Sequence, residues 1–129
     1  MEQRFEIPGR LGSLNDYILK CRANPHTGNN YKHSQQGLII EYIRDLQRVE
    51  CYPLEISFYF YEKNAKRDID NVAGWAHKCI LDALVKAGII ENDGWKQIRS
   101  IRDYFEIDRE NPRIVVILKE RGDRDEEED

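Results

Sequence analysis

Two aspartates stand two residues apart in the segment KRDIDN, residues 66–71, directly before an apolar run. One interpretation is a helix start, because Asp and Asn are good N-caps and acids suit the positive end of a helix. The other is a site for a hard divalent cation. If residues 67–70 are extended, Asp68 and Asp70 point the same way, and their mutual repulsion favours a bound cation. Mg²⁺ prefers such oxygen ligands and often binds one or two carboxylates plus substrate phosphates.

Two further charged groups follow along the chain. Asp93 lies in the turn ENDG, after the apolar run rather than within it. Lys78 and Asp82 have the spacing of a surface ion pair on one helix face. Lys78 is alternatively suited to stabilise negative charge that develops on a phosphodiester. Asp68 and Asp70 are therefore candidate metal ligands, with Asp93 and Lys78 as further candidates for the same site.

Several other cations are candidates for contacts with nucleic-acid phosphates. Some accompany a polar segment rich in Asn, Gly and His, and others would share one face if residues 96–102 were locally helical. For each group the alternative is ordinary solvated charge. The candidates are Arg10, Lys20, Arg22, Lys32, Arg67, Lys96, Arg99 and Arg102.

The composition predicts one domain with a single core. The chain has 129 residues, of which 40% are apolar and 34% charged, and no segment approaches the roughly 18 apolar residues of a membrane span. The first residues lack the apolar core of a signal peptide. Cys21, Cys51 and Cys79 have no metal-binding spacing, so we expect reduced thiols in a cytoplasmic protein.

The net charge of −4 is concentrated at the C-terminus. Residues 120–129 contain seven acids and two arginines, a charge of −5, whereas residues 1–119 carry 18 Lys and Arg against 17 Asp and Glu. Acidic runs at a terminus are typically solvated tails, so we expect 120–129 to be disordered. The acidic overall balance therefore says little against a polyanionic partner.

The pattern of apolar residues predicts an α+β fold, a single compact domain over residues 1–119. A mixed β-sheet would carry two main helices packed largely on one face. We expect no regular structure in the polar segment 21–37. Periodicity and β-branched runs place strands at 4–7, 52–63, 97–108 and 113–120, and helices at 35–49 and 71–87.

The segments RDIDN, residues 67–71, and KCILDALVKAGIIENDGWKQI, residues 78–98, resemble the RusA family of Holliday-junction resolvases, small phage-associated endodeoxyribonucleases. The resemblance covers most of residues 4–119. It implies a Mg²⁺-dependent homodimer, with Mn²⁺ as a substitute, that makes paired nicks in branched DNA such as a four-way junction during recombination and repair. It also implies that Asp68, Asp70 and Asp93 are catalytic metal ligands, that Lys78 is a catalytic residue, and that the protein does not associate with a membrane.

The chain departs from the family pattern in two places. About four extra residues separate Asp70 from Lys78, and Gly74 stands where ungapped counting would place that lysine. Asn92 replaces an acid common in the turn. These departures keep two alternatives open. One is a non-cleaving protein that binds branched DNA or serves phage replication, and the other is a non-enzymatic dimer in which the aspartates cap a helix.

Distance along the predicted helix constrains the candidate site. About 16 helical residues between Asp70 and Gly88 would span about 24 Å, so Asp93 would lie at the far end from Asp68 and Asp70. Two antiparallel copies of the helix, related by a two-fold axis, would place the turn of one subunit beside the paired aspartates of the other. We therefore predict composite sites shared between the subunits of the homodimer.

Overall fold

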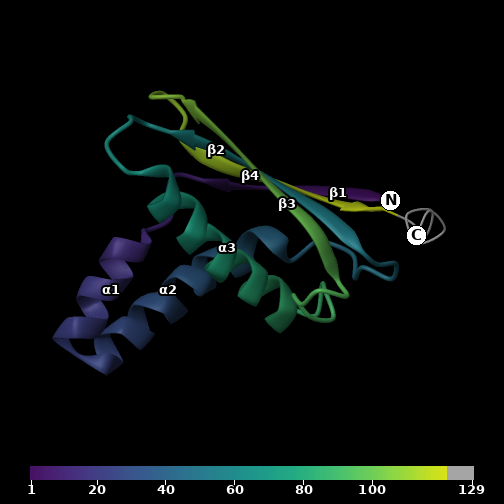
Figure 1. Cartoon of the computed structure of the whole chain (residues 1–129), viewed down its shortest axis with the longest axis horizontal. Coiled ribbons are helices and arrows are strands. Elements are labelled where there is room, and N and C mark those ends of the chain that lie inside the picture. The colour runs from purple at the N-terminus through teal and green to yellow at the C-terminus, as the bar shows by residue number, and fades with distance from the viewer. Residues whose placement is uncertain (122–129) are drawn as a thin grey trace.

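A computed structural model describes residues 1–121 of the chain. Figure 1 shows the sheet on one side of the molecule and the helices together on the other. The elements in chain order are β1 (Glu2–Pro8), α1 (Leu14–Ala23), α2 (Pro25–Ile43), β2 (Leu54–Glu62), α3 (Ile69–Lys86), β3 (Ile98–Ile107) and β4 (Arg113–Glu120).

The four strands form one mixed sheet in the order β1-β4-β2-β3. β4 runs antiparallel to both β1 and β2, whereas β2 and the edge strand β3 are parallel. Parallel neighbours need a crossover connection, and α3 supplies it. The predicted α+β class, single domain and mixed sheet are thus confirmed, and the helices cover one face of the sheet as expected.

The core lies between the sheet and α3. On β2, Leu54, Ile56, Phe58 and Phe60 alternate with half-buried residues and face the helices, as predicted. From α3 the core receives a fully buried apolar stripe that includes Trp75, Ile80 and Leu84. Cys79 belongs to the same stripe, and its burial raises the pKa of the thiol to about 12. The three cysteines are free, as expected.

The prediction for the polar segment was wrong, because residues 21–37 belong to two helices. Ser13 caps α1 by accepting a hydrogen bond from the Asp16 N–H, and Asn24 caps α2 in the same way through the His26 N–H. Tyr17 and Tyr31, one from each helix, pack against the Trp75 ring with centroids 4.9 and 5.4 Å away. Capping and this aromatic cluster stabilise α1 and the first half of α2, whereas the second half of α2 buries Ile39 and Ile43 in the core.

The boundaries of two predicted segments also change. The helix predicted over 35–49 is the second half of α2 and ends at Ile43, so residues 1–121 form three helices rather than the two main helices expected. Glu120, assigned above to the tail, pairs with Leu54 as the last residue of β4. The rest of the predicted tail, residues 122–129, lies outside the described residues. No helix within 1–121 is both long enough and apolar enough to cross a membrane.

Candidate active site

The paired aspartates lie at the N-terminal end of α3. Asp68 is the N-cap residue, with an extended backbone (φ −66°, ψ 143°), but its side chain makes no capping hydrogen bond. Asp70 lies in the first helical turn, so the extended segment expected over 67–70 ends at Asp68. Both side chains are exposed. Neither carboxylate accepts a hydrogen bond or ion pair from any residue in 1–121. A capping role therefore does not account for them.

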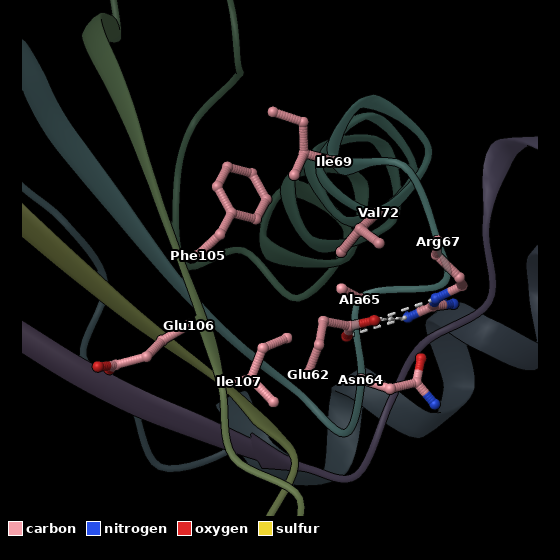
Figure 2. A pocket seen from close by; sticks show the side chains of 9 residues that line it. All are labelled: Glu62, Asn64, Ala65, Arg67, Ile69, Val72, Phe105, Glu106 and Ile107. Atoms are coloured by element: carbon pink, nitrogen blue, oxygen red, sulfur yellow. Dashed lines mark hydrogen bonds and ion pairs between the residues drawn. The ribbon is translucent and has the colours of Figure 1, made fainter.

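The loop that carries these aspartates is anchored by Glu62, the last residue of β2 (Figure 2). Its Oε1 accepts hydrogen bonds from Arg67 Nη2 at 2.9 Å and Nε at 3.1 Å, and Oε2 accepts from Nη2 at 3.1 Å. Arg67 Nη1 also donates to the Leu11 carbonyl at 2.8 Å, and Arg10 Nη2 lies 3.1 Å from Glu62 Oε1. Charge-assisted contacts of this kind fix the residue that directly precedes Asp68.

Two predicted DNA contacts therefore have a different environment from the one expected. The side chains of Arg10 and Arg67 are only 23% and 21% exposed and are committed to Glu62. Sequence reasoning missed Glu62 itself. A signal was available, because Glu62 continues the alternation of Leu54 to Phe60 and so places a charge at a position that faces the core.

Asp93 lies at the opposite end of α3. The helix has 18 residues and continues unbroken past Gly74, so it spans about 27 Å. Asp93 follows its C-terminus in an exposed turn, where the Asp93 N–H donates to Asn92 Oδ1 at 2.9 Å. Within residues 1–121, no group of three or more His, Cys, Asp or Glu could hold a metal. One chain therefore does not bring the three aspartates together.

Lys78 is exposed midway along α3, about 12 Å from Asp70 along the helix axis. The ion pair expected between Lys78 and Asp82 is absent from the described residues. Asp82 Oδ2 instead lies 3.3 Å from Lys32 Nζ and accepts a hydrogen bond from Gln36 Nε2. At Gly74 the helix meets α1, and a Cβ there would lie 2.7 Å from Leu14 Cδ1. The glycine therefore leaves room for the Leu14 side chain at this contact.

The remaining predicted DNA contacts are spread over the chain. Lys20 and Arg22 are exposed on α1, Lys96 is exposed in the turn after Asp93, and Lys32 is held by its ion pair. The shared helical face proposed for residues 96–102 was wrong, because β3 begins at Ile98. Arg99 and Arg102 are exposed on this edge strand.

A second pair that sequence reasoning missed connects α3 to β3. His77 Nε2 lies 2.7 Å from Asp103 Oδ1, and the two side chains are 26% and 24% exposed. No sequence signal links residues 26 positions apart on different elements. The pair lies midway along α3 and holds the edge strand against the helix.

Comparison with known protein families identifies the chain. The family model of endodeoxyribonuclease RusA matches residues 15–119, from the first turn of α1 to the end of β4. The chain belongs to the RusA endodeoxyribonuclease family. No curated protein matches it. The match includes both aspartates before α3, Lys78 and the Asp93 turn, so the candidate residues lie within the nuclease family's own domain.

Proposed function

We propose that the protein is a Mg²⁺-dependent endonuclease that resolves Holliday junctions or related branched DNA by paired nicks. The observation that carries this proposal is the pair of exposed carboxylates, Asp68 and Asp70, left without protein partners at the N-terminus of α3 in a nuclease-family chain. Two like charges in one helical turn repel each other, and a bound cation relieves that repulsion.

The donor set suits a hard divalent cation. Asp68 and Asp70 offer carboxylate oxygens to solvent, as Mg²⁺ or the substitute Mn²⁺ requires, and Mg²⁺ commonly takes only one or two carboxylates with water and phosphate oxygens. An ion held there supplies an activated water and positive charge beside the scissile phosphate. The Glu62–Arg67 contact holds the loop that presents Asp68 and thereby orients these ligands.

The third ligand, Asp93, comes from the partner subunit of a homodimer in this proposal. About 24 Å of helix lies between Asp70 and Lys86, and Asp93 lies beyond that end of α3, which supports a composite site. A two-fold axis that crosses α3 near its middle exchanges the two ends of the helix between subunits. Each dimer then has two sites, as paired nicks on opposite strands require.

In this proposal the exposed Lys and Arg side chains bind the DNA phosphates on either side of the two sites. Lys78 lies between the two ends of α3, where it would contact a phosphate next to the one that is cut. Lys20 and Arg22 on α1 would hold a DNA arm, with Lys96, Arg99 and Arg102 at the other end of the molecule. Arg10 and Arg67 would act through the loop they anchor rather than through phosphates.

A junction-cleavage assay tests this function. The full chain, incubated with a labelled four-way junction, should release nicked duplexes with Mg²⁺ or Mn²⁺ and none with EDTA. Binding without cleavage under every metal condition would favour the alternative, a non-cleaving protein that binds branched DNA or serves phage replication. Asn92 and the extra helical turn between Asp70 and Lys78 keep this alternative open. In the cell, the proposed activity belongs to recombination and repair of DNA in the cytoplasm of a host that carries the gene in a prophage.

A further inference from the structure

Large apolar side chains are exposed along the groove between α3 and the edge strand β3. We call this surface the α3–β3 face. Trp95, in the turn that carries Asp93, is 95% exposed and so has almost no contact within its own chain. The exposed members of the face are Ile69, Trp95, Ile101, Phe105 and Ile107.

An apolar cavity opens on this face at the end opposite Trp95. Its volume is about 230 Å³, and its apolar walls come from α3 and β3. Figure 2 shows Ile69 and Val72 on one side, Phe105 and Ile107 on the other, and the Glu62–Arg67 contact beside them. A cavity of about 150 Å³ with similar walls admits benzene, so this one has room for a larger aromatic ring.

A two-fold axis between two copies of the chain would exchange the two ends of the face. The cavity lies near the start of α3 and the end of β3, whereas Trp95 lies with Leu81 and Ile101 near the end of α3 and the start of β3. The His77–Asp103 pair lies between them. A two-fold axis that lies in the interface and crosses α3 at this pair would place Trp95 of the partner subunit over the cavity, and the reverse.

We propose that Trp95 of each subunit inserts into the Ile69–Phe105 cavity of a second copy of this chain and thereby locks the dimer. Shape and polarity support this occupant, because Trp95 is 95% exposed in its own chain and the cavity of a second copy offers the apolar walls that the indole lacks. Buried tryptophans surrounded by polar groups are typical of the residues that dominate interface energy.

The lock gives the composite site its geometry, and in this respect the inference rests on the proposed function. Asp93 is two residues before Trp95, and Ile69 stands between Asp68 and Asp70. Insertion of the partner's Trp95 against Ile69 therefore delivers the partner's Asp93 to the paired aspartates. Dimerisation and assembly of the metal site become one event.

Sedimentation velocity of the full chain, with Mg²⁺ and without DNA, tests the lock. The wild type should be a dimer, and Trp95→Ala should raise the monomer–dimer Kd at least about tenfold. Ile107→Glu, which puts a charge on the cavity wall while Trp95 is intact, should do the same. Leu38→Ala is the matched control, because Leu38 is 51% exposed on α2, away from the α3–β3 face.

Other outcomes overturn the inference. A Trp95→Ala protein with an unchanged Kd would do so, and weaker junction binding by that dimer would show that the indole faces DNA instead. A wild-type protein that stays monomeric would contradict both the proposed lock and the composite site. If both variants dissociate the dimer while the wild type cuts no branched DNA, the lock stands and the proposed nuclease function fails.

A photo-crosslinking experiment gives an independent readout. A benzophenone amino acid at position 107 of the full chain should crosslink to the peptide that contains Trp95 of the partner subunit. Mixing isotopically heavy and light protein distinguishes crosslinks between subunits from those within one. Crosslinks confined to other peptides would overturn the proposed contact.

Discussion

Asp70 and Asp93 lie beyond reach of each other at opposite ends of α3, one in its first turn and the other in the exposed turn after Lys86. From Asp70 to Lys86 the unbroken helix rises about 24 Å, and Asp93 lies beyond its end. Ligands of one divalent ion must all lie within a few ångströms of it. If Asp70 and Asp93 serve one ion, the two residues must therefore come from different chains, and this requirement governs the first two predictions.

Asp70→Asn should lower the cleavage rate of a four-way junction at least about a hundredfold, because it removes an anionic metal ligand. Junction affinity measured in EDTA should be unchanged or higher, since one negative charge no longer repels the phosphates. Asp45→Asn is the matched control, because Asp45 is an exposed acid beyond the C-terminus of α2. Undiminished cleavage by Asp70→Asn would remove this residue from the site.

Mixing the Asp70→Asn and Asp93→Asn proteins should restore activity that neither has alone. In a mixed dimer with composite sites, one site receives both substitutions and the other receives neither. The intact site should nick a junction once, so nicked four-way junctions should accumulate on a native gel rather than paired products. Random exchange makes about half of the dimers mixed. If subunits exchange and the mixture stays inactive, each site is built from one chain.

Much of this fold was readable from the sequence because the apolar residues follow regular periods. The alternation from Leu54 to Phe60 and the helical stripe through Trp75 and Leu84 each bury one face, so the period reports the element directly. The hairpin formed by α1 and the first half of α2 has no such stripe. It is stabilised by the caps at Ser13 and Asn24 and by contacts with Trp75, more than 40 residues away from Tyr31 in sequence.

The candidate site was readable only in part for a similar reason. Asp68, Asp70 and Asp93 are recognisable by type and spacing, and their separation follows from the length of a helix. The partners of Arg67 and His77 are not recognisable in this way. Glu62 and Asp103 reach them because β2 ends beside the loop that leads to α3, and because β3 lies parallel to β2 against α3.

Lys78→Ala should lower junction cleavage about tenfold or more and leave the dimer mass unchanged, since Lys78 is exposed and has no ion pair within the described residues. Lys78→Arg should keep part of the activity because the charge remains. Lys119→Ala, an exposed lysine on β4, is the control. Equal rates for Lys78→Ala and Lys119→Ala would show that the cation on α3 is ordinary solvated charge.

Glu62→Gln should separate the positioning of the paired aspartates from DNA binding. The substitution keeps the size of the side chain but leaves Arg10 and Arg67 without their buried counter-charge, which should lower the free energy of unfolding by about 2–4 kcal/mol. Guanidinium denaturation monitored by circular dichroism measures this loss. The Asp68 loop should then be less well held, so single-turnover cleavage should slow more than junction affinity falls.

The matched control for Glu62 is Glu106→Gln. Glu106 is exposed on β3, and Figure 2 shows its side chain directed away from the cavity. Its substitution should change neither stability nor cleavage. If Glu62→Gln lowers stability while the cleavage rate at saturating junction concentration stays at the wild-type value, then Glu62 stabilises the fold and does not position the catalytic loop. A lowered rate at saturation, restored by the conservative Glu62→Asp variant, is expected if the contact with Arg67 orients the catalytic loop.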